Sequence, residues 1–146
     1  MNTAESHAEA APTLREATAD DVPFILNSWL RSYEPTATAA GVPRGRFYAE
    51  HHTKVTRLLQ RGRCLLAVNP AEPSVILGYA AYEERGGQVV LHYLYVKHQL
   101  RRMGLGRHLA EQVRARGCRY THHTRAGARL VELLGARYSP EFIESP

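Results

Sequence analysis

The stretch Leu94-Tyr-Val-Lys-His-Gln-Leu-Arg101-Arg-Met-Gly104-Leu-Gly106-Arg-His-Leu109 joins a strand pattern to an Arg- and Gly-rich turn and the start of a helical pattern. The first amides of a helix have no partner within the helix and lie at the positive end of its dipole, so they can bind a pyrophosphate. Gly104 and Gly106 remove side chains that would block this approach. Arginine forks suit phosphate oxygens, and three are present, namely Arg101, Arg102 and Arg107.

Hydrophobic periodicity and turn residues place further elements around this turn. Strands are predicted at 13–17, 64–68, 75–83, 89–96, 118–122 and 136–143. Helices are predicted at 22–33, 47–62, 105–117 and 124–135. The segment 34–45 holds two prolines and two glycines, so a loop is predicted there.

The predicted order of elements is β-α-α-β-β-β-α-β-α-β, which indicates a mixed α/β sheet. Gly86-Gly87 favours a hairpin between the third and fourth strands, and this hairpin should form the centre of the sheet. The fourth strand, a helix and the fifth strand form a crossover unit with parallel partners. We expect a flexible N-terminal tail at 1–12 and one domain at 13–146, with neither a signal sequence nor a membrane-spanning segment.

The chain of 146 residues has a formal charge of +5. Nine Lys or Arg and a single acid, Glu111, fall between Lys97 and Arg129, which indicates a phosphate-rich cofactor, a nucleic acid or simply a solvated basic face. Cys64 and Cys118 lie beside apolar or aromatic residues in predicted strands. Buried free thiols are therefore expected, and they suggest a cytoplasmic setting.

The turn resembles the acyl-CoA motif of the GNAT (GCN5-related N-acetyltransferase) superfamily, Gln/Arg-x-x-Gly-x-Gly/Ala, with Arg101, Gly104 and Gly106 as its matching residues. Leu94 and Val96 fall where the family's fourth strand carries Leu-x-Val. The order of strands and helices also fits, so the resemblance covers nearly the whole chain. The chain looks like a short single-domain member, and the phage-associated type is one option. A dinucleotide-binding Rossmann site fits less well, because its third glycine is Leu109 here and its motif follows the first strand.

The resemblance implies that acetyl-CoA or another acyl-CoA is the co-substrate. The family holds its pantetheine arm between splayed fourth and fifth strands and places an oxyanion donor on the fourth strand, here around Tyr95 or Val96. The acceptor would be a primary amine of a small molecule, peptide or protein, entering beside segment 34–45 and the second helix. The expected cofactor-binding residues are Leu94, Tyr95, Val96, Arg101, Arg102, Met103, Gly104, Leu105, Gly106 and Arg107.

The expected catalytic base is His92, because histidine accepts a proton at neutral pH and some family members use a histidine at this strand position. Glu83, Tyr93 or a held water are the alternatives. The family often places a tyrosine acid four residues before the glycine of its last helix, and this chain has Val131 there. Tyr138 or Tyr120 could replace that acid, or the thiolate could leave unaided.

Histidines occur in two adjacent pairs, His51-His52 and His122-His123, and histidine is a common metal ligand. Adjacent histidines point in different directions on a helix or a strand, and no ligand cluster accompanies them, so no metal is predicted. His51, on the apolar face of its helix, suits a core histidine better than a substrate contact. Tyr79, Tyr82, Tyr93 and Tyr95 suit sheet packing better than base stacking.

Two other functions stay open on the sequence alone. The basic segment would suit a GNAT-fold enzyme that modifies a nucleobase in DNA, of the Mom-like type found in bacterial viruses. The valine at position 131 would suit a domain that binds CoA without catalysis. The acceptor, the acyl group and the oligomeric state, with a homodimer among the options, are not readable from these residues.

Overall fold

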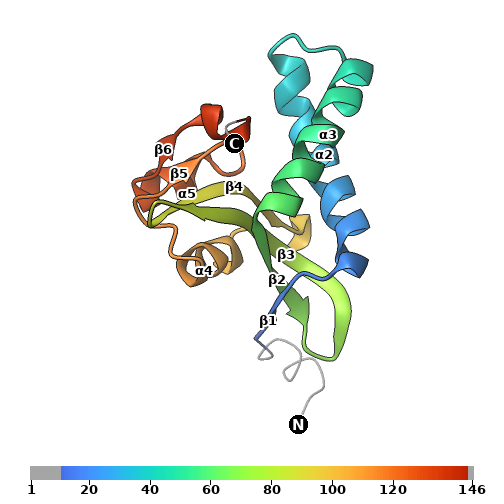
Figure 1. The fold of residues 1–146 in the computed structure, drawn as a ribbon. Coiled ribbons are helices and arrows are strands. Elements are labelled where there is room, and N and C mark those ends of the chain that lie inside the picture. The colour runs from blue at the N-terminus through green and yellow to red at the C-terminus, as the bar shows by residue number, and fades with distance from the viewer. Residues whose placement is uncertain (1–10, 145–146) are drawn as a thin grey trace.

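The computed structural model describes residues 11–144, so the predicted tail at 1–12 lies almost wholly outside the described part. The elements follow the predicted order, and the fold class is confirmed (Figure 1). The strands are Thr13–Glu16 (β1), Arg63–Asn69 (β2), Glu72–Arg85 (β3), Gln88–Val96 (β4), Arg119–Tyr120 (β5) and Arg137–Tyr138 (β6). The α-helices are Val22–Ala39 (α2), Arg44–Arg61 (α3), Leu105–Gln112 (α4) and Ala128–Leu134 (α5), and short 3₁₀ turns cover Ala19–Asp21 (η1), His98–Leu100 (η2) and Pro140–Ile143 (η3).

The six strands form one sheet in the order β1-β2-β3-β4-β5-β6. The pairs from β1 to β4 are antiparallel, whereas β4–β5 and β5–β6 are parallel. The hairpin of β3 and β4 forms the centre, and Gly86 and Gly87 connect it with φ angles of 55° and 80°. The predicted central hairpin and parallel crossover are both confirmed. No helix within residues 11–144 has the length and apolar character to cross a membrane.

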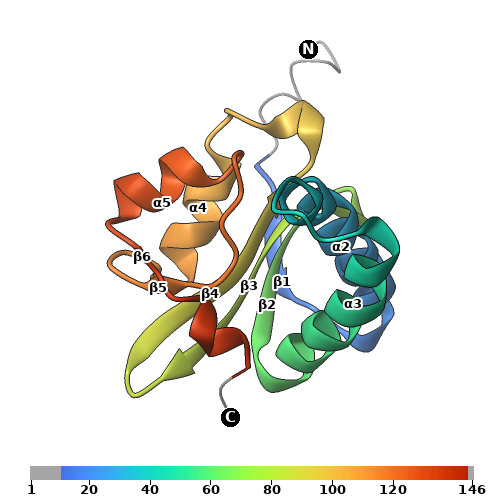
Figure 2. The same cartoon turned by 90° about the horizontal axis from the view of Figure 1, so that it is seen from above.

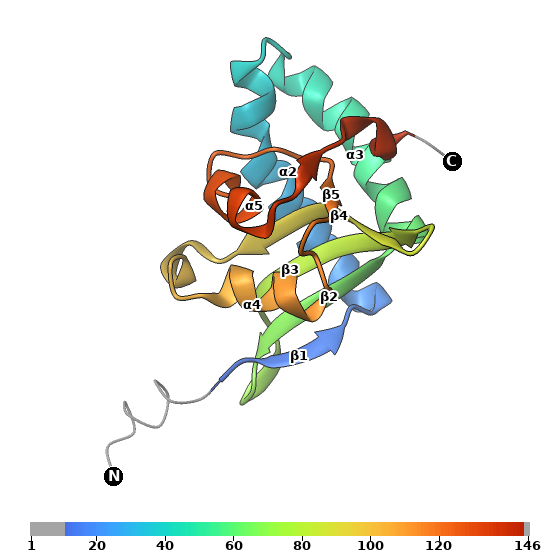
Figure 3. The same cartoon turned by 90° about the vertical axis from the view of Figure 1, so that its left-hand side faces the viewer.

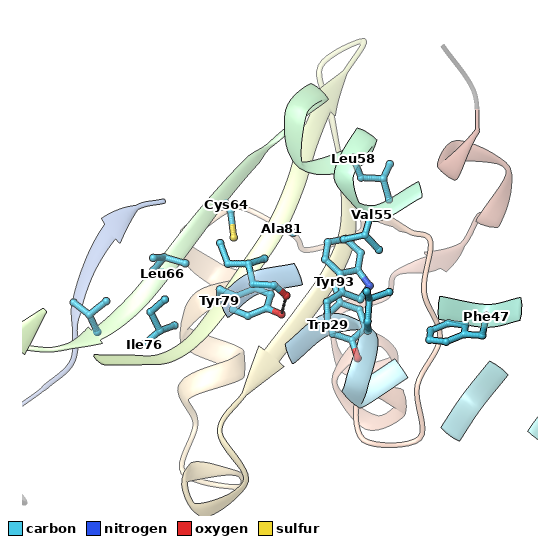
Figure 4. Packing of buried hydrophobic residues seen from close by; sticks show 13 residues of the cluster. Trp29, Phe47, Val55, Leu58, Cys64, Leu66, Ile76, Tyr79, Ala81 and Tyr93 are labelled. Carbon is cyan, nitrogen blue, oxygen red and sulfur yellow. Dashed lines mark hydrogen bonds between the residues drawn. The ribbon is translucent and has the colours of Figure 1, made fainter. Parts of the chain in front are cut away.

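The helices cover the two faces of the sheet in pairs. Seen from above, α2 and α3 lie on one side of the strands and α4 and α5 on the other (Figure 2). The α2/α3 side is rich in rings, and we call it the aromatic face; Trp29, Phe47, Tyr79 and Tyr93 are its largest buried side chains (Figure 4). The α4/α5 side is mostly aliphatic, and we call it the aliphatic face; Leu105, Leu109, Ala110 and Val113 are buried there.

The prediction of a loop over 34–45 is wrong. Helix α2 runs through Pro35 to Ala39, and only four residues separate it from α3. Tertiary contacts override the proline, because Ala37 and Val42 pack on the aromatic face and Arg44 forms an ion pair with Glu34 (Nε–Oε1 3.0 Å) across the connection.

The C-terminal elements are shorter than predicted. Helix α4 ends at Gln112, because Arg114 takes a left-handed conformation with φ of 59°. Strand β5 stops at Tyr120, where the chain turns away from β4, and Pro140 begins η3 soon after β6. Helix α4 lies across β2 and β3 on the aliphatic face (Figure 3). The thiols of Cys64 and Cys118 are free and buried.

Candidate functional site

The N-terminus of α4 is built by a left-handed turn. Gly104 caps the helix with φ of 83°, and Arg102 before it also has a positive φ of 67°. The first bond within the helix runs from His108 N–H to the Gly104 carbonyl (2.9 Å). The amides of 105–107 therefore have no carbonyl of their own helix to bind and remain available for an anion.

The side chains of this turn take different positions. Arg101, Arg102, Met103 and Arg107 are exposed, and Met103 is 72% exposed. Arg101 donates from Nε to the Val96 carbonyl (3.2 Å), and Arg107 pairs with Glu111 (Nε–Oε1 3.2 Å). These arginines surround the amides with positive charge.

Leu105 packs into the aliphatic face with 8% exposure, so only its main chain can meet a ligand. Gly106 lies directly against β4. A Cβ added to Gly106 would stand 3.4 Å from Leu94 Cδ2, 3.5 Å from Val96 Cγ2 and 3.6 Å from Leu130 Cδ2. A methyl group just fits there, and a branched side chain would not. Leu94 and Val96 therefore meet the turn, whereas Tyr95 points to the other face, where it stacks on Tyr79 with ring centroids 5.2 Å apart.

Strands β4 and β5 diverge after two residue pairs. They pair at Val90↔Arg119 and Leu91↔Tyr120, and the last bond runs from Thr121 N–H to the Leu91 carbonyl (3.1 Å). Within residues 11–144, no strand pairs with this edge of β4 beyond Leu91. A narrow crevice opens there. It is lined by Leu91, His92, Tyr93, Leu94, Tyr120, His122, His123, Thr124, Gly127, Leu130 and Val131.

His92 forms a β-bulge in β4. Ala81 pairs with Tyr93 and Tyr82 with Leu91, so His92 is the extra residue between them. A bulge reverses the alternation of side chains along a strand, which explains why Leu91 faces the aliphatic side and Tyr93 the aromatic side. The sequence carries no signal for this bulge.

His92 is 1% exposed and lines the crevice from inside. Its Nδ1 lies 2.9 Å from Thr121 Oγ1, and its Nε2 lies 3.3 Å from Glu83 Oε2. The second contact is not well aligned, so among the described residues His92 Nε2 and Trp29 Nε1 are the buried side-chain atoms without a well-formed hydrogen bond. Burial lowers the pKa of His92 to about 4, against the opposing effect of Glu83.

Glu83 is fixed as a buried carboxylate. Arg61 donates to its Oε2 (Nε–Oε2 2.7 Å), and Arg85 Nε donates to its Oε1. Arg61 also donates to the Phe142 carbonyl (Nη2–O 2.7 Å). Burial acts to raise the pKa of Glu83, but the bonds from Arg61, His92 and Arg85 together lower it below its ordinary value. Glu83 therefore acts as a counter-ion at one end of the site.

A chain of hydrogen-bonding groups continues from His92 to α3. Thr121 Oγ1 lies 2.9 Å from His122 Nδ1, and His122 Nε2 lies 2.9 Å from His51 Nε2. We call the series Glu83, His92, Thr121, His122 and His51 the histidine chain. Burial lowers the pKa of His51 to about 4 and that of His122 well below its ordinary value, so both rings are neutral at pH 7.

A larger cavity of about 590 Å³ lies between α2, α3 and the C-terminal strands. Its lining residues are Tyr33, Thr36, Ala37, Ala40, Val42, Phe47, Glu50, His51, Lys54, Tyr120, His123 and Tyr138. Tyr120 and His123 line both this cavity and the crevice, and Tyr120 OH lies 3.1 Å from His123 Nδ1. The cavity and the crevice therefore meet at this pair. His51 is both a hydrogen-bonded ring and part of the cavity wall.

Tyr93, one of the alternative bases, packs on the aromatic face. Tyr93 OH lies 2.6 Å from Ser32 Oγ, and burial raises its pKa to about 12, so the hydroxyl stays protonated at pH 7 and is not available as a base. In residues 11–144 no group of three or more His, Cys, Asp or Glu side chains is arranged to hold a metal ion.

Exposed arginines surround the N-terminus of α4. The hypothesis that they bind a nucleic acid stays a prediction.

Solved structures share this fold. A histone acetyltransferase HPA2 and related acetyltransferase from Corynebacterium glutamicum aligns with a TM-score of 0.61 at 17% identity, over 86% of this chain and 84% of that chain. The GNAT family N-acetyltransferase YhbS from Escherichia coli, in complex with CoA, aligns with a TM-score of 0.50 at 20% identity, over 70% and 54%. The protein AAC(6′)-Iy, in complex with the bisubstrate analogue CoA-S-monomethyl-acetylneamine, aligns with a TM-score of 0.53 at 14% identity, over 88% and 92%.

No curated protein sequence matches the chain significantly. A sequence model of the acetyltransferase (GNAT) family matches residues 22–127, which include the turn at α4, the crevice strand β4 and the whole of helix α3. The resemblance drawn from Arg101, Gly104 and Gly106 is thereby confirmed, and the chain belongs to the GNAT acetyltransferase family.

Proposed function

We infer that this protein is an N-acyltransferase that moves an acetyl or other short acyl group from acyl-CoA directly to a primary amine. One observation carries the inference, namely that the anion-binding turn of α4 lies beside a crevice that shares Tyr120 and His123 with a cavity large enough for a small molecule. Two substrates can thus approach one junction from two sides, as direct transfer requires.

The turn is proposed to hold the pyrophosphate of acyl-CoA. The amides of 105–107 and the side chains of Arg101, Arg102 and Arg107 supply donors and charge, and Met103 and Gly104 shape the turn. The unpaired edge of β4 at 94–96 supplies main-chain groups to an extended amide-bearing arm, in the manner of an added strand. YhbS and AAC(6′)-Iy, which share the fold, are solved with CoA or a CoA analogue.

The acceptor is proposed to be a small primary amine with an aromatic or apolar body. Rings of Tyr33, Phe47 and Tyr138 form much of the cavity wall. The wall carries one carboxylate, Glu50, which is already paired with Arg46 (Oε1–Nε 2.9 Å), and one lysine, Lys54. A polycationic acceptor would find little charge compensation here, so a singly charged amine with a flat body suits the cavity better.

His92 is proposed as the group that finally accepts the proton of the amine. Its ring is neutral at pH 7 and lies beside the carboxylate of Glu83. Val131 lines the crevice where the family often has a tyrosine acid. Tyr120 lines both spaces, so it is the better placed of the two candidate replacements, and Tyr138 lines the cavity alone.

The binding site is tested by titrating CoA calorimetrically into wild type, Gly106→Ala and Gly106→Val. We expect the alanine variant to bind nearly as wild type, because its methyl group fits, and the valine variant to lose at least about tenfold in affinity, because a branched side chain closes the space beside Leu94 and Val96. Equal affinities for the two variants, or no heat from wild type, would contradict the site.

The reaction is tested by following free thiol release from acetyl-CoA with a panel of acceptors, comprising tyramine, tryptamine, spermidine, kanamycin and a lysine-containing peptide. We expect the two aromatic amines to give the highest kcat/KM. A preference for spermidine or kanamycin would contradict the proposed acceptor class, and CoA binding without any turnover would favour the domain that binds CoA without catalysis.

A further inference from the structure

The histidine chain connects the proposed acceptor cavity with the buried ionic cluster around Glu83, so it joins a site of proton release to a site that can stabilise a positive charge. One end, His51, lies in the wall of the acceptor cavity, and the other end is the ionic cluster around Glu83. Every link from His51 through His122 and Thr121 to His92 is 2.9 Å between heavy atoms, which is hydrogen-bonding distance throughout. The members come from α3, from β3, from the bulge of β4 and from the segment just after β5.

We propose that the histidine chain is a proton relay, which takes a proton from the amine at His51 and holds it on His92 beside Glu83. The proposal rests on the proposed acyl transfer and adds a route for its proton. His51 is the residue that touches the substrate, and His122, Thr121 and His92 pass the proton inward.

Glu83 gives the relay its direction. His92 Nε2 lies 3.3 Å from Glu83 Oε2 without a well-aligned bond, and a lone pair on this nitrogen would be repelled by the carboxylate, so we assign the hydrogen to Nε2. His92 Nδ1 then has a lone pair for the Thr121 hydroxyl. Thr121 then accepts from His122 Nδ1–H, which leaves His122 Nε2 to accept from His51 Nε2–H. The remaining nitrogen, His51 Nδ1, then has a lone pair to accept a proton, and His51 forms part of the cavity wall.

The proton count closes at each step. A proton from the amine binds His51 Nδ1, while His51 gives its Nε2 proton to His122 Nε2. His122 gives its Nδ1 proton to Thr121, and the hydroxyl proton of Thr121 passes to His92 Nδ1. His92 then carries two N–H protons and one positive charge next to Glu83, and the reverse sequence returns the proton to the site, where the departing thiolate takes it.

Neighbouring side chains fix the position of the His51 ring, and burial keeps the three histidine rings neutral. The His51 ring packs against both Tyr33 and Phe47, with centroids 5.3 and 5.1 Å away, and these contacts fix its position. Burial keeps all three rings neutral at pH 7, and only a neutral ring can both accept and donate. Lys54, near His51, and Arg61 and Arg85, near His92, are the cations that oppose a charge on these rings, and Glu83 is the anion that favours it on His92.

The first test does not depend on turnover. Two-bond ¹⁵N–¹H correlation spectra of ¹⁵N-labelled wild type at pH 7 report which ring nitrogen of each histidine carries hydrogen. We expect hydrogen on Nε2 of His92, on Nδ1 of His122 and on Nε2 of His51. The opposite tautomer at any of the three, or a charged His51 ring, would overturn the relay.

The second test removes and restores the hydroxyl link. Thr121→Val deletes the oxygen with little change of shape, and we expect kcat for amine acetylation to fall about 10- to 100-fold with KM for acetyl-CoA unchanged. Thr121→Ser should recover most of the lost rate, and Thr53→Val, at an exposed position of α3, is the matched control for the exchange itself.

The two proposals fail in different ways. If wild type acetylates amines but Thr121→Val and Thr121→Ser are equally fast, the relay is wrong and the acyl transfer stands. If wild type neither binds nor uses acetyl-CoA, the acyl transfer is wrong, and the tautomers alone decide whether the relay exists. Should Thr121→Val not fold, the spectra of wild type still decide.

Discussion

The two faces of the sheet are built from different chemistry. The aliphatic face holds α4 with side chains that make no hydrogen bonds, such as Leu105, Leu109 and Val113. The aromatic face buries tyrosine rings whose hydroxyls are hydrogen-bonded: Tyr79 OH donates to the Ile25 carbonyl (3.0 Å), and Tyr93 OH lies 2.6 Å from Ser32 Oγ. The aliphatic face supports the turn at the N-terminus of α4, and the aromatic face carries a polar network that reaches the cavity between α2 and α3.

The two faces therefore contribute differently to the candidate site. Packing against the aliphatic face holds the α4 turn, whose main chain is proposed to bind the phosphates. The bulge at His92 shifts the alternation of side chains along β4, so that Leu91 packs on the aliphatic face and Tyr93, two residues later, packs on the aromatic face. Four expectations follow from the contrast, from the largest effect to the smallest.

Loss of packing should be most costly under α4. Leu109 is fully buried, and Leu109→Ala should lower the free energy of unfolding by about 2–5 kcal/mol through lost contacts and a cavity. Leu133, which is 64% exposed in α5, is the control, and Leu133→Ala should change stability by less than about 0.5 kcal/mol. Urea unfolding measures both, and similar losses would show that α4 is not anchored as described.

Acid should weaken the aromatic face. The pKa of His92 is about 4 in the folded chain and near 6.5 when unfolded, so between these values the unfolded chain binds more protons. Stability is therefore lost as pH falls from 6.5 to 4, on the order of 3 kcal/mol for His92 alone. Unfolding free energies measured across this range should fall more steeply for wild type than for His92→Gln. His52→Gln, at an exposed position of α3, should keep the steeper fall.

A single hydroxyl of the aromatic face should have a moderate effect. Tyr93→Phe removes the bond to Ser32, whose own hydroxyl still donates to the Ser28 carbonyl (2.6 Å), so we expect a loss of about 1 kcal/mol. Tyr138→Phe, at a half-exposed ring, should leave the free energy of unfolding nearly unchanged. Thermal unfolding of both variants measures the difference. A neutral Tyr93→Phe would mean that the polar network adds no stability.

The surface ion pair beside the turn should matter least for stability. Arg107 and Glu111 are both more than half exposed, so Arg107→Ala should change stability by less than about 0.5 kcal/mol. The affinity of the Arg107→Ala variant for CoA should nevertheless fall by up to about fivefold, because the guanidinium charge near the bound phosphates is removed. Unchanged affinity in a calorimetric titration would remove Arg107 from the phosphate site.

The local parts of the site could be predicted from the sequence. Arg101, Gly104 and Gly106 lie in one turn between a strand and a helix, so their spacing alone indicated the α4 cap and the family. The sequence could not show that packing buries the side chain of Leu105, so that only its main chain can meet a ligand. The helical run through Pro35 was missed for a similar reason, since contacts of Ala37 and Val42 outweigh a local breaker.

By itself the sequence determined the fold class, the order of elements, the glycine hairpin and the phosphate-type turn, because each depends on residues that are neighbours in the chain. Only the tertiary structure decided the bulge at His92, the early end of β5 and the meeting of His51 with His122, which are 71 residues apart. These features depend on how two helices and two diverging strands are laid against each other. No periodicity within a single element carries that information.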